Sequence, residues 1–183
     1  MLNQQVTTFE HGWLVAAVDG EGCIGITRRN RHAATLGFTL KPHVQLTNCD
    51  RSFIERYCSI LKKADIAFHV SHAMPKARRR EYWNVVVAGL KRVVRYLPLL
   101  TEYLCDEKRD KARLTLEFCE SRLAKWHAAP FSERELELAT AVSHLNVRGK
   151  KIEVLNLRDY TPSSYSSKYR FTVAKDIVQT TTP

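Results

Sequence analysis

Two acidic residues separated by a glycine, in the segment Asp19-Gly20-Glu21-Gly22, are the first candidates for chemistry in this sequence. They directly follow an apolar run, so a hydrophobic helix is expected to end on them. Carboxylate and carbonyl oxygens suit Mg²⁺, which takes few protein ligands and keeps several of its waters. The Glu21 carboxylate and the Gly20 carbonyl therefore predict part of a magnesium site, although the segment by itself fits a solvated turn better.

The expected helix has one stripe that is almost free of side chains. Gly12, Ala16 and Gly20 recur every four residues, and small residues at this spacing let two helix backbones approach closely. In water such a stripe more often packs against a neighbouring element of the same chain. Two copies of the helix would bring two Glu21 carboxylates together, and these repel unless a cation lies between them. The stripe predicts a dimer interface at Gly12, Ala16, Asp19 and Gly20.

The chain as a whole is strongly basic. Its 183 residues include 29 Lys and Arg against 19 Asp and Glu, a formal net charge of +10. An excess of this size indicates nucleic acid or another anionic surface as a partner. The five cysteines form no CxxC pair, which favours reduced thiols in an intracellular protein, in the cytoplasm or an organelle matrix. No apolar run approaches the roughly 20 residues of a membrane span, so no membrane partner is expected.

The pattern of apolar residues predicts an α+β fold. Thr7 and Glu10 have the form of a capping box that begins a helix at about residue 8, and Asp50 can cap the next helix. The expected order is α-β-β-α-β-β-α with further helices. The predicted helices run from about 8 to the glycines, then 51–63, 90–103, 106–127 and 133–145, and the strands are 23–29, 37–48, 66–72 and 80–88.

The sequence WLVAAVDGEGCI, residues 13–24, closely resembles the signature helix of the LAGLIDADG homing endonucleases. The predicted order of elements also matches the core of that family, and the resemblance covers about residues 8–128. The single copy of the motif is similar to the homodimeric members. The chain departs from the family pattern at Glu21, where aspartate is commoner, and at Val15-Ala16, where Ala-Gly is commoner. Glutamate offers the same metal chemistry with a longer side chain.

The resemblance implies roles for the residues of the motif. Glu21 resembles the metal-binding acid, and Gly20 resembles the residue whose backbone carbonyl joins it. Asp19 resembles the first acid of the motif, which supports the helix junction more than it binds metal.

The resemblance also implies two catalytic residues outside the motif. QLTN at 45–48 is similar to the end of a family strand, which makes Asn48 a polar residue at the edge of the active site. EKRDKARL at 107–114 resembles the start of a later basic helix, which makes Lys108 the active-site lysine. Lys111 remains an alternative, because the spacing from Pro98 is longer than usual.

The predicted sheet has an apolar face and a polar face. Alternation in the second strand buries Phe38, Leu40, Pro42, Val44 and Leu46, and Pro42 suits an edge position or a bulge. Arg, Lys, Asn and Gln are side chains that read base edges in the major groove. Because the resemblance implies a concave DNA-binding sheet, we expect DNA contacts from the outward residues Thr27, Arg29, Arg31, Thr39, Lys41, His43, Gln45, Arg80, Tyr82 and Asn84.

The function implied by the resemblance is site-specific cleavage of both strands of double-stranded DNA by a homodimer at a long, roughly palindromic site, as in an intron-encoded homing endonuclease. The implied cofactor is Mg²⁺, with Mn²⁺ able to substitute and Ca²⁺ bound without supporting cleavage. Glu21 of each subunit would hold metal that activates water, and Lys108 would stabilise the negative charge of the transition state.

Three other interpretations stay open. The chain could be a non-cleaving relative, such as an intron RNA-splicing maturase, with RNA as its partner, or a DNA-binding regulator. It could be a basic structural or ribosome-associated protein, which would show neither metal dependence nor a two-fold dimer. The stripe of Gly12, Ala16 and Gly20 makes this structural protein the weakest of the proposed functions. A metal or base cluster of His43, His69 and His72 is also disfavoured, because histidines in strands are more often surface residues or DNA contacts.

The predicted domain organisation is one endonuclease domain over residues 1–149, with its core at about 8–128 and an added helix at about 132–145. Ser132 and Glu135 form a second capping box before this helix. From Lys150 the composition shifts to Lys, Ser, Tyr and Thr, which predicts a basic C-terminal extension over 150–183 that is loosely packed or partly disordered.

Overall fold

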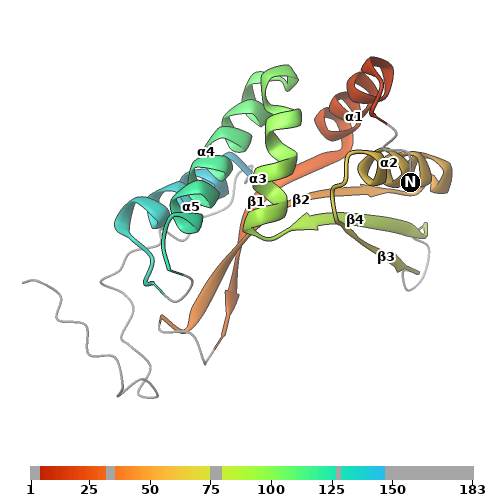
Figure 1. Cartoon of the computed structure of the whole chain (residues 1–183). Coiled ribbons are helices and arrows are strands. Elements are labelled where there is room, and N and C mark those ends of the chain that lie inside the picture. The colour runs from red at the N-terminus through yellow and green to blue at the C-terminus, as the bar shows by residue number, and fades with distance from the viewer. Residues whose placement is uncertain (1–4, 32–35, 75–79, 127–128, 147–183) are drawn as a thin grey trace, which may run out of the picture.

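The computed structural model describes residues 5–31, 36–74, 80–126 and 129–146. Four antiparallel strands form a sheet in the order β1-β2-β4-β3, and the helices gather on one side of it (Figure 1). The predicted α+β fold and its order of elements are confirmed. The elements are α1 (Thr8–Glu21), β1 (Gly22–Asn30), β2 (Phe38–Asn48), α2 (Arg51–Lys63), β3 (His69–Ala73), β4 (Tyr82–Ala88), α3 (Leu90–Tyr96), short 3₁₀ turns η1 (Leu97–Leu99) and η2 (Thr101–Tyr103), α4 (Asp106–Leu123) and α5 (Glu133–Asn146).

The starts of α1 and α2 form as their sequences predict. The Thr7 hydroxyl accepts the Glu10 N–H at 3.2 Å, and the Glu10 carboxylate accepts the Thr7 N–H at 3.0 Å. Asp50 accepts the N–H groups of Ser52 and Phe53 at 2.8 and 3.3 Å. These bonds satisfy N–H groups that have no partner inside the helix. The helices that precede and follow the β1–β2 hairpin in the sequence therefore begin at fixed residues.

The β1–β2 hairpin sets the register of the sheet. Gly22 pairs with Leu46 and Asn30 with Phe38 at the two ends of the ladder. The alternation predicted for β2 is confirmed, because Phe38, Leu40, Pro42, Val44 and Leu46 are all buried. Pairing of β2 with β4 begins only at His43. Pro42 lies one residue beyond this ladder, and its carbonyl accepts the Gly89 N–H at 3.1 Å. Its missing N–H therefore falls at the end of the β2–β4 pairing, although β2 is an inner strand and not an edge strand.

Several predicted elements have other bounds than expected. α4 ends at Leu123 and not at about residue 127, and β4 begins at Tyr82 and not at residue 80. The third strand begins at His69 and not at residue 66, because the Ile66 N–H still bonds to Leu61 O of α2, and Ile66 is buried as part of the turn. The predicted helix at 90–103 divides into α3 and the turns η1 and η2. Pro98 lies at that break, and proline cannot donate the bond that would continue an α-helix.

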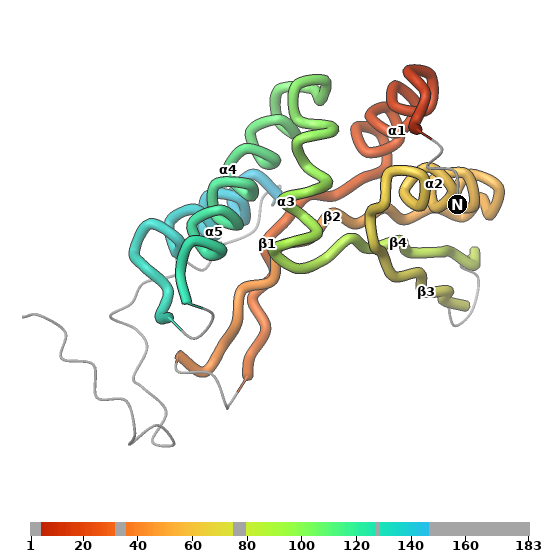
Figure 2. Tube along the Cα trace, in the orientation of Figure 1, coloured from red at the N-terminus to blue at the C-terminus, as the bar shows by residue number. Residues whose placement is uncertain are grey.

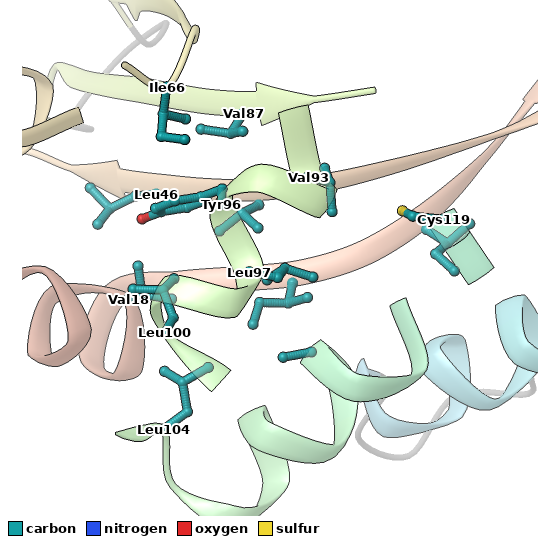
Figure 3. Packing of buried hydrophobic residues seen from close by; sticks show 14 of the residues in the cluster. Val18, Leu46, Ile66, Val87, Val93, Tyr96, Leu97, Leu100, Leu104 and Cys119 are labelled. Carbon is teal, nitrogen blue, oxygen red and sulfur yellow. The ribbon is translucent and has the colours of Figure 1, made fainter. Parts of the chain in front are cut away.

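The hydrophobic core lies between the sheet and the helices (Figure 3). Leu46 and Val87 of the sheet meet Val18 of α1 and Tyr96 of α3 in a cluster of fully buried side chains. The hydroxyl of Tyr96 is 2.7 Å from that of Tyr57, so this polar atom is paired inside the core. The core fixes α1 and α3 against the same region of the sheet.

Figure 2 shows that the β1–β2 hairpin bends away from the helices, so that the sheet is curved. No helix of the described residues lies against the far face of the sheet. None of these helices is long and apolar enough to cross a membrane. The predicted extension at 150–183 falls outside the described residues.

Candidate active site and nucleic-acid interface

The junction of α1 and β1 positions the acidic motif. Glu21 is the last residue of α1, and Gly22 turns directly into β1 with extended backbone while its N–H bonds to Val18 O. A Cβ atom at Gly22 would lie 2.5 Å from Val18 O, so only glycine fits this tight turn. The Glu21 side chain is exposed, and within the described residues its carboxylate has no hydrogen-bond or ion-pair partner.

Lys108, in the first turn of α4, reaches the end of α1. Its ammonium group donates to Val18 O at 2.7 Å and also to Asp19 O. The last carbonyls of a helix lack partners and carry partial negative charge, so a cation is favourable there. Partial burial lowers the pKa of Lys108, while the nearby Asp19 carboxylate acts in the opposite direction. Lys111 is buried and pairs with Glu107 of its own helix at 2.7 Å, so the geometry favours Lys108.

Asp19 makes the reciprocal contact from α1 to α4. Its carboxylate accepts the Cys105 N–H at 3.2 Å and the Cys105 thiol at 2.6 Å. Cys105 occupies the N-cap position of α4 and offers no side-chain cap of its own. The hydrogen bond and the negative charge of Asp19 raise the pKa of the Cys105 thiol. Asp19 thus links the end of α1 to the start of α4.

Asn48 lies at the end of β2 that is nearest to the acidic motif. Because Gly22 pairs with Leu46, Thr47 and Asn48 extend past the start of β1, level with the last residues of α1. Asn48 Oδ1 accepts the Asp50 N–H at 2.8 Å, which fixes the side chain just before α2. Its amide nitrogen has no bonding partner among the described residues and remains available to a ligand.

The stripe of small residues on α1 is open. Gly12, Ala16 and Gly20 are all exposed, and a Cβ atom at Gly12 or Gly20 would meet nothing within 4 Å. Phe9, one helical turn before Gly12 and Trp13, is 71% exposed. The sequence left open whether the stripe packs against another element of the same chain. Within the described residues it does not.

The far face of the sheet carries the polar residues predicted for it. In β2, the outward residues alternate with the buried ones and are Thr39, Lys41, His43 and Gln45. Across the hairpin, Lys41 pairs with Thr27, and Thr39 pairs with Arg29. The predicted phase of β4 is confirmed, because Val85 and Val87 are buried, which turns Tyr82 and Asn84 outward. Arg31 and Arg80 are exposed just beyond the ends of β1 and β4.

His43 is the most enclosed of these outward residues. Its ring lies over Gly25 of β1, where a Cβ atom would be 3.0 Å from His43 Cε1. Burial lowers the pKa of His43, and the charge of Arg29 lowers it further, against the effect of the Lys41 carbonyl. The imidazole of His43 is therefore harder to protonate than a free one.

Comparison with known proteins gives matches only to solved structures; no family model and no curated protein matches the sequence. The homing endonuclease I-CvuI, solved with DNA in the presence of Mg, superposes with a TM-score of 0.62 at 22% identity over 82% of this chain and 91% of that one. The archaeal intron-encoded homing endonuclease I-Vdi141I, complexed with DNA, gives 0.61 at 18% identity over 78% and 87%. The I-LtrWI LAGLIDADG homing endonuclease bound to target DNA gives 0.57 at 18% identity over 74% and 44%. This chain has the LAGLIDADG homing-endonuclease fold.

The LAGLIDADG fold brings together the residues that the sequence singled out in separate segments. Lys108 of α4 contacts the last turn of α1, which Glu21 ends. Asn48 of β2 lies two residues beyond the pairing of Leu46 with Gly22, at the same end of the sheet. The contact of Cys105 with Asp19 was not foreseen, because a cysteine before a helix has no distinctive sequence pattern. The histidines do not converge: His69 pairs with Val86, while His72 stacks on Trp83 at 4.9 Å.

The oxygen donors at the junction suit a hard cation but are too few in one protomer. Glu21 and Gly20 supply one carboxylate and one carbonyl, and the described residues contain no group of three or more His, Cys, Asp or Glu that could hold a metal ion. Mg²⁺ is often bound through one or two carboxylates. The donor set therefore fits a metal that is shared with a second copy of the same helix end.

Proposed function

We propose that the protein is a site-specific endonuclease that acts as a homodimer, binds a long, roughly palindromic double-stranded DNA site and hydrolyses both strands with Mg²⁺. One observation carries the proposal. An exposed, unpaired Glu21 ends a helix whose open stripe allows a second copy to approach, and Lys108 lies on the adjacent carbonyls. DNA as substrate implies an intracellular location.

The dimer is supported by three features of the chain. Gly12, Ala16 and Gly20 leave the α1 backbone accessible, and the metal donors of one protomer are incomplete. The chain also matches 91% of I-CvuI, so a single copy of this fold accounts for nearly all of that chain. It matches only 44% of I-LtrWI, a chain more than twice the matched length. Two copies packed through α1 would place two Glu21 side chains and two Gly20 carbonyls next to each other, on the two-fold axis of the complex.

The junction residues divide the chemistry between them. Glu21 and Gly20 would hold the metal, which lowers the pKa of bound water and polarises the phosphodiester. Lys108 provides a cation, held by Val18 O and Asp19 O, that stabilises the extra negative charge of the transition state. The free amide nitrogen of Asn48 can orient a water molecule or a phosphate oxygen at the edge of the site.

The sheet supplies recognition of the DNA. β2 has 11 residues and spans roughly 36 Å at about 3.3 Å per residue. Since DNA rises about 3.4 Å per base pair, one protomer follows roughly ten base pairs and the dimer roughly twenty. Thr27, Arg29, Arg31, Thr39, Lys41, His43, Gln45, Arg80, Tyr82 and Asn84 line this face.

A cleavage-site selection tests the proposal. The full chain is incubated with a randomised DNA library in Mg²⁺, Mn²⁺, Ca²⁺ or EDTA, with Glu21→Gln in parallel, and both bound DNA and new double-strand ends are sequenced. We expect discrete ends at one long, near-palindromic site with Mg²⁺ and Mn²⁺ only, and none with Glu21→Gln. Specific binding without ends in every condition would reject cleavage and leave a maturase or DNA-binding regulator.

A further inference from the structure

Three polar side chains on the outward face of the sheet form a closed hydrogen-bond network. Gln45 Nε2 donates to Asn84 Oδ1 at 3.1 Å and approaches Thr47 Oγ1 at 3.4 Å. The Thr47 hydroxyl donates to Asn84 Oδ1. The residues come from β2 and β4, where Thr47 pairs directly with Asn84. All three side chains are part-buried, so their orientations are held by their neighbours.

The network determines what the two amides leave unpaired. Turning Asn84 alone would set two N–H groups against each other, and turning Gln45 alone would oppose two oxygens. Turning both amides together exchanges the two free groups, so in either arrangement one free donor and one free acceptor remain. Within the described residues, Gln45 Oε1 remains as a free acceptor and the Asn84 amide nitrogen as a free donor. The pair thus presents one acceptor and one donor on two amides that are joined by a hydrogen bond of 3.1 Å.

We propose that Gln45 and Asn84 together read one adenine in each half-site, and that Thr47, whose hydroxyl bonds to Asn84, is a positioning residue that holds the Asn84 side chain in place. This inference rests on the proposed function, because it needs the sheet to lie in the major groove. Thr47 itself was not among the residues expected to contact DNA, and its effect on recognition passes through Asn84.

Adenine is the purine whose major-groove edge complements such a pair. It offers the N7 acceptor and the N6 amino donor, whereas guanine offers two acceptors, N7 and O6. The free nitrogen of Asn84 can donate to N7 of either purine. Gln45 Oε1 can accept only from the adenine amino group, and against guanine it would face O6 with no proton between them.

The test begins with sites selected by binding in Ca²⁺, so that it does not depend on cleavage. We expect each half-site to contain an adenine whose preference is lost with Gln45→Ala and with Asn84→Ala. At that position, guanine, 7-deazaadenine (no N7) and purine (no N6 amino group) should each weaken binding roughly 5- to 150-fold, the range for one bidentate base contact.

Thr47 is tested by removing and then restoring its hydroxyl. Thr47→Val should reduce the preference for adenine over guanine at that position, while Thr47→Ser, which keeps the donor, should retain it. Thr140→Val makes the same change on α5, away from the outward face of the sheet, where the hydroxyl bonds to Leu136 O of its own helix, and it should leave this preference intact. Circular dichroism checks that each variant is folded.

The outcomes separate the two claims. A selected site whose adenine preference survives Thr47→Val, or that requires guanine at the position controlled by Gln45 and Asn84, overturns the inference and leaves DNA recognition standing. Failure of the wild-type protein to enrich any sequence overturns the proposed function, and the inference with it.

Discussion

The ammonium group of Lys108 lies 2.7 Å from the carbonyl oxygen of Val18, so the first turn of α4 is tied to the last turn of α1. The tie is reciprocal, since the Asp19 carboxylate of α1 accepts the N–H and thiol of Cys105 at the start of α4. Each helix end offers a group that suits the other: a cation for the partial negative charge of the last carbonyls of α1, and an acceptor for the N–H at the start of α4. The exposed Glu21 follows directly on this joint.

Replacing Lys108 should separate catalysis from binding. Lys108→Met removes the cation but keeps a long apolar side chain, so we expect DNA cleavage to slow by about 10²- to 10³-fold, the typical cost of losing one stabilising group in the transition state. Binding of the selected site in Ca²⁺ should change little. Single-turnover cleavage rates and binding isotherms measure the two effects.

Lys111→Met is the matched control for Lys108→Met. The Lys111 ammonium is buried and paired with Glu107, so this change should act on stability more than on the cleavage rate of folded protein. A loss of cleavage rate with Lys111→Met alone would transfer the catalytic role to Lys111.

Removing the Cys105 thiol should loosen the joint. Cys105→Ala leaves the Asp19 carboxylate with one fewer donor, and we expect the unfolding free energy to fall by about 1 kcal/mol, the usual net value of one hydrogen bond. Cys105→Ser keeps a donor and should restore most of the loss. Urea denaturation of the three proteins at pH 7 measures the differences, and equal loss in both variants would show that the contact is packing alone.

The raised pKa of Cys105 gives a second measure of the same joint. Although Cys105 is exposed, its thiol should react slowly with iodoacetamide near pH 8, because the thiolate is the reactive form and Asp19 disfavours it. Asp19→Asn removes the negative charge and should speed alkylation of Cys105, as measured by peptide mass spectrometry. A reaction rate at Cys105 that is unchanged by Asp19→Asn would contradict the contact.

Gly12 within α1 and Gly22 at its C-cap should respond differently to substitution, the first in dimer formation and the second in the stability of the protomer. Gly12→Leu meets open space in the protomer, and we expect it to keep the fold while it blocks close approach of a second helix, giving a monomer by sedimentation. Gly22→Ala places a Cβ atom 2.5 Å from Val18 O and should destabilise the protomer itself. A dimer of unchanged affinity with Gly12→Leu would reject the stripe as the interface.

The sequence predicted most of the fold because its signals are local. The capping residues Thr7 and Asp50 and the alternation in β2 each depend on neighbours a few residues away, and the structure places all of them as expected. The start of β3 was wrong, because the chain first closes the turn after α2 and buries Ile66. Hydrophobic pattern alone cannot distinguish a buried turn residue from the first residue of a strand.

The candidate site was predictable only in part, for a related reason. Glu21 and Gly20 belong to one recognisable motif, whereas Lys108 could be placed only by resemblance to a basic helix. The bonds of Asp19 to Cys105 and of Thr47 to Asn84 join segments far apart in the chain. Such contacts depend on register and helix packing, and no spacing rule within one segment indicates them.

The buried carboxylate of Glu135 carries the last prediction, on stability. Glu135 lies in the first turn of α5 and is fully buried. Burial alone would raise the pKa of Glu135, but hydrogen bonds from Lys125, the Ser132 N–H and Ser121, together with the charge of Arg122, outweigh it and lower that pKa. Because the carboxyl group is harder to protonate when folded, it contributes stability above its unfolded pKa of about 4.5, and this contribution is lost as the pH falls.

Glu135→Ala should therefore cost about 3–5 kcal/mol of unfolding free energy at pH 7, because it leaves the buried Arg122 without its ion-pair partner. The fall of stability between about pH 5 and pH 3 should also be shallower in the variant than in the wild type. Glu137→Ala is the control, since its exposed pair with Arg134 is worth at most about 1 kcal/mol. Urea titrations across this pH range measure both effects, and parallel curves for wild type and Glu135→Ala would show that the carboxylate is not the group that titrates.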